Sequence, residues 1–455
     1  MSEYKRKKVH KTSNKRKTKI KEDNNIFFDD EDLEEKPKKT KKQLKKPLPK
    51  KKPPKTKRVV EKDEIKEEPE VLSDEETKRR TFRVIDKPNK AKRFFRSLIG
   101  FVLILVIIFG ANYFLPGGLF ESIKNAFVFL GSEDYPIEYN GSLLSDSVTM
   151  GSAKVLLNDN ALTVFNKNGK EVYKHQHGFV NPVLAHSDSR IIVFDEGGDT
   201  LNLYSKSGFI RAINPGHEII NASVSRNGYV AVSCVGEGYT STVYVYGKNG
   251  KKVYTWNSAK DLVNAVSISP NGKKIAVSCC NAKNGISASK LYVLEYKSAD
   301  PVFSKDYNDN FIIAITSNIS NFGCVTEDGY KSYSWFSYKE KSVTAKDKKL
   351  SMLRRDGNGT LLVFNRNNDR SDNKVILLSM FGGKKAEIQV DKNITDIECK
   401  GGRIYVISGT EVLIYNKKGE IVYSGECNYG VKRFYIISSK SIAVIMDDKI
   451  EKITL

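Results

Sequence analysis

A unit of about forty residues containing four short β-strands recurs along the second part of this chain. Its strands are rich in β-branched and aromatic residues, and Asn, Gly, Asp and Lys separate them. The first strands are 35, 39, 43, 47, 40, 44 and 37 residues apart, anchored at Val148, Val183, Ala222, Ala265, Ile312, Met352, Asp396 and Arg433. This period is typical of a β-propeller, in which each unit forms one blade. A β-helix has shorter rungs, and a sandwich does not keep such a register through eight units.

The connection between the third and fourth strands is the most regular part of the unit. It reads LTVFNKNGKEVY (162–173), LNLYSKSGFIRAI (201–213), VYVYGKNGKKVY (243–254) and VLIYNKKGEIVY (412–423). Glycine supplies the positive φ of a tight hairpin, and we expect the aromatic residue before the turn to pack inside. Ser-Arg-Asn-Gly (225–228) and Ser-Pro-Asn-Gly (269–272) are typical turns between first and second strands.

The last unit indicates how the ring closes. Residues 433–455 contain three strands, RFYIIS, SIAVIM and KIEKITL, which is one strand too few. The segment YPIEYN (135–140) precedes the first full unit and can supply the missing outer strand, which removes an open sheet edge. We therefore predict an eight-bladed propeller, with a seven-bladed ring as the alternative if the weak first unit is misread.

These repeats resemble known propeller families. The third-to-fourth strand run is similar to quinoprotein-like blades, which carry an aromatic-Asp-x-x-x-Gly-Lys-x-x-Trp run, and Ser-Pro-Asn-Gly-Lys resembles WD40-type and TolB-type turns. The layout of residues 97–455 resembles uncharacterised single-pass, propeller-bearing membrane proteins of low-GC Gram-positive bacteria. The family Trp is replaced by Tyr173, Tyr254 and Tyr423, and the family Asp by Asn166, Ser205, Gly247 and Asn416. The resemblance implies the fold and no particular activity.

One apolar segment precedes the repeats. Residues 97–115 read SLIGFVLILVIIFGANYFL, which contains no charge and gives about 28 Å of helix, close to the thickness of a bilayer core. Lys92, Arg93 and Arg96 stand before it. Because the flank with the Lys and Arg excess stays in the cytoplasm, we expect the repeats to be extracytoplasmic. The predicted parts are a disordered cytoplasmic tail (1–93), a transmembrane helix (94–115), a juxtamembrane amphipathic segment (116–136) and an extracytoplasmic propeller (137–455).

The predicted tail holds most of the net charge. Residues 1–96 contain 34 Lys or Arg and 19 Asp or Glu, so +15 of the total +22 lies in this part. Such a segment buries too little apolar surface to fold alone. Three interpretations remain open: a solvated tail that sets topology, contact with anionic lipid or an acidic partner, and nucleic-acid binding. Nucleic acid is the least favoured, because no aromatic residues interleave with the charges.

The juxtamembrane segment has a helical pattern. LFESIKNAFVFL (119–130) places its apolar residues near one face of a helix. They are Leu119, Phe120, Ile123, Phe127 and Leu130. Two interpretations are equally favoured: a helix lying in the membrane interface, and a linker helix packed on the next domain.

The six cysteines all lie in the predicted outer domain: Cys234, Cys279, Cys280, Cys324, Cys399 and Cys427. An extracellular location permits disulfides, but Cys234, Cys279 and Cys324 close second strands of successive blades, where a small buried residue is favoured. Cys279 and Cys280 resemble the vicinal disulfide of alcohol-oxidising quinoproteins. Neighbouring side chains of a strand point to opposite faces, so we expect free thiols.

Metal and catalytic signals are weak. His175 and His177 share one strand face, and His217 lies in the equivalent connection one unit later, but no Cys or carboxylate completes a ligand set. The sequence has no nucleophile elbow, no phosphate-binding glycine loop and no EF-type calcium loop. We therefore expect no catalytic residues, no metal and no cofactor.

The most favoured function is a membrane-anchored binding or scaffolding module at the cell surface, with a protein or cell-envelope ligand. The candidate binding face comprises the connections between second and third strands and between blades. Its candidate residues are Tyr239, Asn284, Arg370 and Asp372, chosen by position. Two alternatives stay open: an enzyme such as a quinoprotein-like dehydrogenase, and a surface sensor that signals through the cytoplasmic tail.

Protease protection tests the predicted orientation. External protease added to intact cells is expected to leave a fragment containing residues 1–96 and to digest epitopes beyond residue 135, because the tail faces the cytoplasm. Immunoblotting with tags at each end measures the outcome, and loss of the tail epitope from sealed cells indicates the inverted orientation.

Overall fold

The structure is a computed structural model that describes residues 90–114, 117–133, 135–138, 144–283, 286–308, 310–326, 328–356, 359–366 and 369–455. The chain divides into two compact units, 1–85 and 86–455, and all described residues lie in the second. Residues 1–89 of the predicted tail lie outside the described residues.

Two helices precede the strands. Helix α2 (Lys90–Phe114) contains the apolar segment, and α3 (Gly118–Val128) covers most of the predicted amphipathic helix. Among the described residues, no helix combines the length and hydropathy that crossing a membrane requires.

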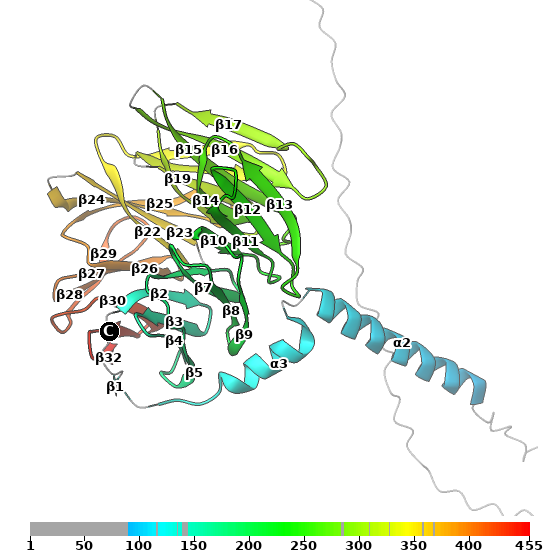
Figure 1. Cartoon of the computed structure of the whole chain (residues 1–455). Helices are drawn as coiled ribbons and strands as arrows, with labels where there is room; N and C mark the ends of the chain where they lie inside the picture. Colours follow the sequence, from blue (N-terminus) through cyan, green and yellow to red (C-terminus); the bar gives the residue numbers. More distant parts are fainter. Residues whose placement is uncertain are drawn as a thin grey trace, which may run out of the picture. The chain divides into compact units, whose positions relative to one another are not determined.

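The remaining described elements are strands, which form eight four-stranded antiparallel sheets (Figure 1). We call these sheets blades 1 to 8 and their strands a to d from the inside outward. Blade 1 consists of β2 (Leu144–Met150), β3 (Ala153–Asn158), β4 (Ala161–Asn166) and β5 (Glu171–Gln176), and blade 2 of β6 (Pro182–His186), β7 (Arg190–Asp195), β8 (Leu201–Ser205) and β9 (Gly208–Ile213). Blade 3 consists of β10 (Ile219–Val224), β11 (Val230–Val235), β12 (Ser241–Tyr246) and β13 (Lys252–Ser258). Blade 4 consists of β14 (Leu262–Ile268), β15 (Lys274–Lys283), β16 (Ile286–Glu295) and β17 (Phe303–Tyr307).

Blades 5 to 8 complete the ring. Blade 5 consists of β18 (Ile312–Ser317), β19 (Asn321–Thr326), β20 (Gly329–Ser334) and β21 (Glu340–Thr344), and blade 6 of β22 (Lys349–Asp356), β23 (Gly359–Arg366), β24 (Asp369–Leu378) and β25 (Lys384–Asp391). Blade 7 consists of β26 (Asp396–Lys400), β27 (Arg403–Ser408), β28 (Glu411–Tyr415) and β29 (Ile421–Glu426). Blade 8 consists of β30 (Arg433–Ser438), β31 (Ser441–Ile445), β32 (Lys449–Thr454) and β1 (Ile137–Glu138). All eight predicted anchor residues lie in strand a of successive blades, which confirms the eight-bladed prediction over the seven-bladed alternative.

Burial differs between the strands because neighbouring blades pack face to face. Strands b and c are covered on both sides, and β3, β4 and β12 are buried along their whole length. The outer strand β25 alternates between exposed and buried residues, since its second face meets solvent. The buried apolar residues form eight clusters, each shared by two adjacent blades.

The predicted turn glycines adopt the conformation that their turns require. Gly169, Gly250 and Gly419 in the c–d turns have φ values of 89°, 78° and 87°, which an L-residue with a side chain rarely adopts. The aromatic residues before these turns are buried as predicted, at 2% exposure for Phe165 and 5% for Tyr415.

The ring closes where the sequence predicts. Strand β1 pairs with β32 through Ile137 opposite Ile450 and Glu138 opposite Lys449, and so supplies the outer strand of blade 8. Ile137 is buried against residues of blades 8 and 1, and the Tyr135 hydroxyl lies 3.0 Å from that of Tyr435. A two-residue strand therefore joins chain segments 300 residues apart.

Substituting Ile137 tests this closure. The change Ile137→Ala is expected to lower the free energy of unfolding by about 2–4 kcal/mol, because it leaves a cavity in the cluster that joins the first and last blades. The same change at the exposed outer-strand residue Ile421 is the control and is expected to cost under about 0.5 kcal/mol. Urea titration measures both, and equal effects at the two sites contradict the closing role of β1.

Candidate functional site

The antiparallel blades give the propeller two different faces. The a–b and c–d turns lie at one end of the strands and form what we call the turn face. The b–c connections and the d–a connections between blades lie at the other end and form the loop face.

The predicted binding residues belong to the loop face, but the structure does not bring them together. Tyr239 lies in the b–c connection of blade 3 and is 47% exposed, whereas Arg370 and Asp372 begin strand c of blade 6. Asn284 lies outside the described residues. Lys348 Nζ lies 2.6 Å from Asp372 Oδ1, and this hydrogen bond lowers the pKa of the carboxyl group. Asp372 therefore has a structural partner already.

The side chains of the candidate metal-binding histidines contact neighbouring residues of the propeller. His175 Nδ1 lies 3.0 Å from the Tyr204 hydroxyl, and His177 Nε2 lies 3.1 Å from the Asn158 carbonyl oxygen. His217 stacks on Tyr244. Among the described residues, no group of three His, Cys, Asp or Glu side chains is arranged to hold a metal ion.

The cysteines are free thiols in the structure. Cys234 and Cys279 occupy the same register of strand b, opposite Ile219 and Val263, whereas Cys324 lies opposite Ile315, further along its strand a. Burial raises the pKa of Cys279 to about 12, so its thiol is protonated at neutral pH.

A polar cavity of about 350 Å³ lies on the propeller axis. Strand a of every blade contributes to its lining. The lining also includes a–b turn residues, among them Asp188, Arg226 and Asn318, but no described residue of the d–a connections. The cavity therefore opens toward the turn face.

Several polar side chains of the lining are used to join adjacent blades. The inner edge of each strand a has no neighbouring strand, so its N–H groups need other acceptors. The Val266 N–H donates to Asn221 Oδ1 (3.1 Å) and the Ile268 N–H to Ser223 Oγ (3.2 Å).

Blades 7 and 8 repeat this arrangement with carboxylates. The Phe434 N–H donates to Asp396 Oδ2 (3.1 Å), and the Ile436 N–H donates to Glu398 Oε2 (3.3 Å). Arg354 Nε donates to Asp396 Oδ1 at 2.9 Å, and Arg433 lies 3.6 Å from the same oxygen. These charges are therefore neutralised within the protein.

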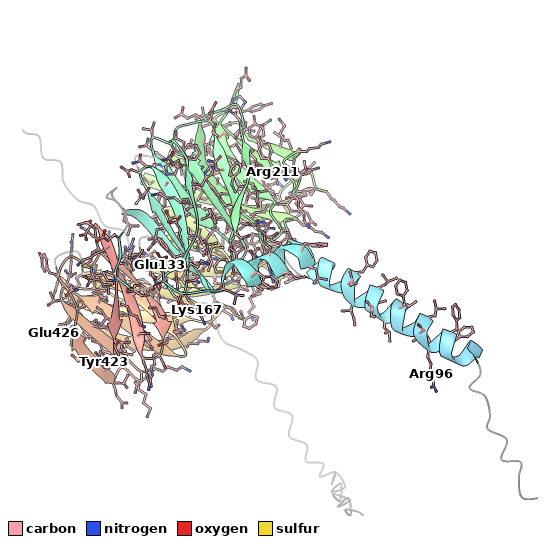
Figure 2. All side chains as sticks on the ribbon, turned by 90° about the horizontal axis from the view of Figure 1, so that it is seen from below. Arg96, Glu133, Lys167, Arg211, Tyr423 and Glu426 are labelled. Atoms are coloured by element: carbon pink, nitrogen blue, oxygen red, sulfur yellow. The ribbon has the colours of Figure 1, made fainter. Side chains whose placement is uncertain are left out.

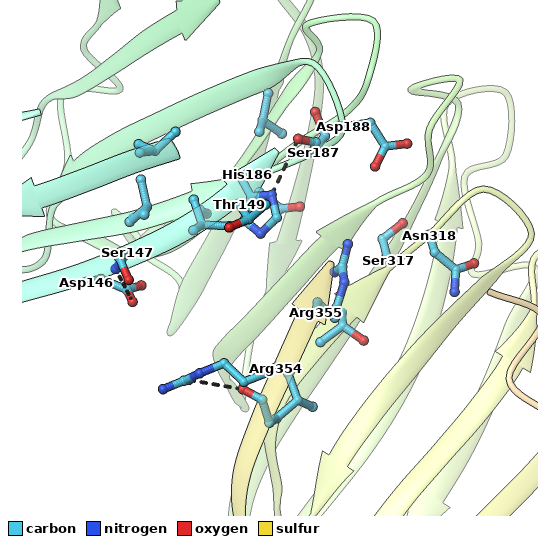
Figure 3. Close-up of a pocket in the computed structure, with 18 of the residues that line it drawn as sticks. Asp146, Ser147, Thr149, His186, Ser187, Asp188, Ser317, Asn318, Arg354 and Arg355 are labelled. Atoms are coloured by element: carbon cyan, nitrogen blue, oxygen red, sulfur yellow. Dashed lines mark hydrogen bonds between the residues drawn. The ribbon is translucent and has the colours of Figure 1, made fainter. Parts of the chain in front are cut away.

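Arg355 differs from its neighbour Arg354. Its guanidinium makes no hydrogen bond or ion pair with another described residue. Burial lowers the pKa of this group, and the nearby Tyr330 and Asp188 act in the opposite direction. Figure 3 shows Arg355 in the same cavity as Asp188, Ser317 and Asn318. The buried Ser317 Oγ also lacks a hydrogen-bond partner among the described residues. These two groups can donate to a ligand without breaking an existing contact.

His186 lies beside these groups. Burial lowers the pKa of His186 to about 4, and the charges of Arg355 and Lys206 act in the same direction. Its imidazole is therefore neutral at neutral pH, with Nδ1 3.4 Å from the Ser187 carbonyl oxygen. Among the described residues, the lining thus offers two guanidinium groups without an ion pair, those of Arg226 and Arg355, beside neutral hydrogen-bonding groups and the carboxylate of Asp188. Two such cations against one such carboxylate suit an anion.

The sequence analysis missed this site. His186, Ser317 and Arg355 were not singled out, although each falls in or at the end of a predicted first strand. The available signal was the pair Arg354-Arg355 in a predicted first strand, because charged side chains are rarely fully buried unless they are paired.

The two faces carry opposite charge. In the described turns between strands, the turn face has twelve basic and three acidic residues, and the loop face has five basic and ten acidic residues. The turn-face residues are Lys167, Lys170, Lys206, Arg226, Lys248, Lys251, Lys273, Lys297, Lys339, Lys417, Lys418 and Lys440, with Asp188, Asp300 and Glu420. The loop-face residues are Lys260, Lys346, Lys348, Lys392 and Lys432, with Asp159, Glu196, Asp199, Glu218, Glu237, Asp261, Asp328, Asp347, Asp447 and Asp448.

Comparisons with known proteins agree with the fold. The model of the "Family of unknown function (DUF5711)" matches residues 137–455, which begin at the first residue of β1. No functionally curated protein matches the chain. The computationally designed Ika8 protein is similar over 71% of this chain and 100% of its own, with a TM-score of 0.51 and 12% identity.

Two natural propellers are similar at lower TM-scores. The C-terminal WD40 domain of Sif2 has a TM-score of 0.47 and 13% identity, and BamB from Moraxella catarrhalis has 0.43 and 10%. Each covers 71% of this chain and 99% of the solved one. At such identities these similarities concern the fold alone.

The pH dependence of stability tests the environment of His186. Below pH 6.5 the unfolded chain takes up a proton at this residue, whereas the folded chain does so only near pH 4. His186 therefore lowers the free energy of unfolding as the pH falls through this window, by at most about 3 kcal/mol. The change His186→Gln removes this contribution. Between pH 7 and pH 4, the free energy of unfolding of the wild type is therefore expected to fall more than that of the variant. Urea unfolding measures the difference, and a pH-independent difference contradicts the burial of a neutral imidazole.

Proposed function

This chain belongs to the family of unknown function DUF5711, and we propose that it is a membrane-anchored, extracytoplasmic propeller that acts as a binding or scaffolding module. Its central cavity takes up an anionic group. The part of the chain before residue 116 supplies the anchor, and the eight-bladed ring supplies the rigid binding body.

The apolar segment supports the anchor. Residues 97–115 contain no charge and are preceded by Lys92, Arg93 and Arg96. In α2, the side chains of Phe101, Ile107 and Phe109 are 59%, 66% and 72% exposed. A helix whose large apolar side chains have no protein partner is stabilised by transfer out of water, and the bilayer core provides that environment.

The observation that carries the binding role is the unpaired guanidinium of Arg355 in the axial cavity. Partial burial of a cation is unfavourable, and the charge of Asp188 offsets this cost without forming an ion pair with Arg355. An anionic ligand lowers the cost further and gains charge-assisted hydrogen bonds. Ser317 Oγ provides a further unused hydrogen-bonding group. A cavity of about 350 Å³ lies at the small end of the size range of ligand sites, so it suits a carboxylate or phosphate group.

Calorimetric titration tests this proposal. Inorganic phosphate and a series of small carboxylates are titrated into the wild type, into Arg355→Gln and into Arg403→Gln, whose arginine is exposed at the start of β27. We expect Arg355→Gln to weaken binding by at least tenfold, or about 1.4 kcal/mol, because a charge-assisted contact is lost. Arg403→Gln is expected to bind like the wild type. Absence of anion binding by the wild type, or equal binding by all three proteins, contradicts the proposed site.

A further inference from the structure

Helix α3 lies against the turn face. Arg190, which follows the a–b turn of blade 2, donates to the carboxylate of Glu121 at 2.6 Å and 2.7 Å. Asn166 Nδ2 at the c–d turn of blade 1 donates to the Phe129 and Gly131 carbonyl oxygens at 3.1 Å and 2.8 Å. The Glu133 N–H continues this contact by donating to the Asn168 carbonyl oxygen, beside Lys167 (Figure 2).

These contacts turn the apolar side of α3 outward. Phe120 and Phe127 are 88% and 70% exposed, and Ile123 and Leu130 are also exposed. The helix is therefore fixed to the propeller by these polar contacts and by Phe129, which follows it and packs on the cluster shared by blades 1 and 2. Its exposed apolar side chains have no partner among the described residues of the propeller. The helix contacts the propeller, as the linker interpretation expected, and it keeps an exposed apolar surface of the kind that interfacial helices have. Its place in a membrane interface stays a prediction.

A second apolar group lies on the same face, in the turns of blades 5 and 6. Ile319, Phe336, Met380 and Phe381 are all exposed. The Trp335 N–H donates to the Ser320 carbonyl oxygen at 3.0 Å, and Ser320 Oγ donates to the Met380 carbonyl oxygen at 3.4 Å. These bonds hold the turns side by side, so their apolar side chains form one group.

The exposed apolar residues of the loop face are arranged differently. In its described connections Val180, Tyr239 and Tyr429 are exposed, but they lie after blade 1, within blade 3 and after blade 7. Val235 and Leu262, at strand ends of blades 3 and 4 on this face, are exposed as well. The loop face is also net acidic in its described connections, whereas the turn face carries twelve basic and three acidic residues. Only the turn face thus combines clustered apolar side chains with excess positive charge in the described part of the chain.

We propose that the turn face, together with α3, lies on an anionic lipid bilayer, with α3 and the turns of blades 5 and 6 inserted among the headgroups. Apolar side chains at this depth leave water, and the surrounding lysines meet lipid phosphates. The acidic loop face then points away from the bilayer. This inference goes beyond the proposed function because it specifies which face meets the membrane and what lipid chemistry it recognises.

Fluorescence quenching in reconstituted bilayers tests the orientation. The full chain is placed in vesicles of phosphatidylglycerol mixed with a brominated phosphatidylcholine, and two tryptophans are introduced separately. Phe381→Trp reports on the turn face, and Tyr429→Trp reports on the loop face. We expect Phe381→Trp to be quenched at least threefold more than Tyr429→Trp, after subtracting the signal of the native Trp256 and Trp335.

Charge reversal tests the lipid chemistry. Lys339 lies in the c–d turn of blade 5, and Lys417 and Lys418 lie in the c–d turn of blade 7, next to blade 6. Their joint replacement by Glu is expected to reduce the Phe381→Trp quenching by at least half. The same triple change at Lys260, Lys346 and Lys432 on the loop face is the matched control and is expected to have no effect. We call the triple Glu variant of Lys339, Lys417 and Lys418 the turn-face variant. Replacing phosphatidylglycerol by a zwitterionic lipid is expected to reduce the quenching of Phe381→Trp as much as this variant does.

The outcomes separate this inference from the proposed function. If α2 does not insert, flotation of the full chain with the same vesicles tests the face directly, and the turn-face variant is expected to float at least tenfold less than its control. Equal quenching at both faces, or equal effects of the two triple variants, overturns the inference. Because the cavity opens toward the same face, phosphate binding is measured in detergent without vesicles. Binding that depends on Arg355 is expected to survive in the turn-face variant, so the cavity and the lipid surface are tested separately.

Discussion

The unpaired inner edge of each first strand is the constraint on which the centre of this molecule depends. Strand a pairs with strand b on one side, and its other edge faces the axis, where no strand is available. Asn221, Ser223, Asp396 and Glu398 supply acceptors to N–H groups of the next blade. Polar groups on the axis are therefore required by the backbone first, and only those left over, such as Arg355, are free for a ligand.

The stability of the ring follows from a related feature. Each of the eight apolar clusters is shared by two blades, so a single blade leaves half of two clusters in water. The ring is therefore cooperative, and the short strand β1 matters because it completes the sheet and the cluster through which blade 8 meets blade 1. The same shared packing holds the turns rigidly enough to present a defined charged face.

The fold was largely predictable from the sequence because its signals are local. A turn glycine such as Gly250 and a buried aromatic such as Tyr246 lie in one hairpin, so the chain around them shows the pattern directly. The site was not predictable in this way. Whether Arg355 has a partner depends on residues of other blades. Tyr239 and Arg370 were chosen because they lie in loops of the same face, but a shared face does not bring residues of blades 3 and 6 into one site.

The pairing of β1 with β32 also sets an order of events during biosynthesis. β1 leaves the ribosome soon after the apolar segment, whereas its partner follows about 300 residues later, so the nascent chain carries an unfinished ring until almost the whole propeller has been synthesised. During that time the exposed faces of the terminal blades are available for wrong association. The final contact then closes a loop of about 300 residues, and its entropic cost is modest because the cost of loop closure grows only slowly with loop length.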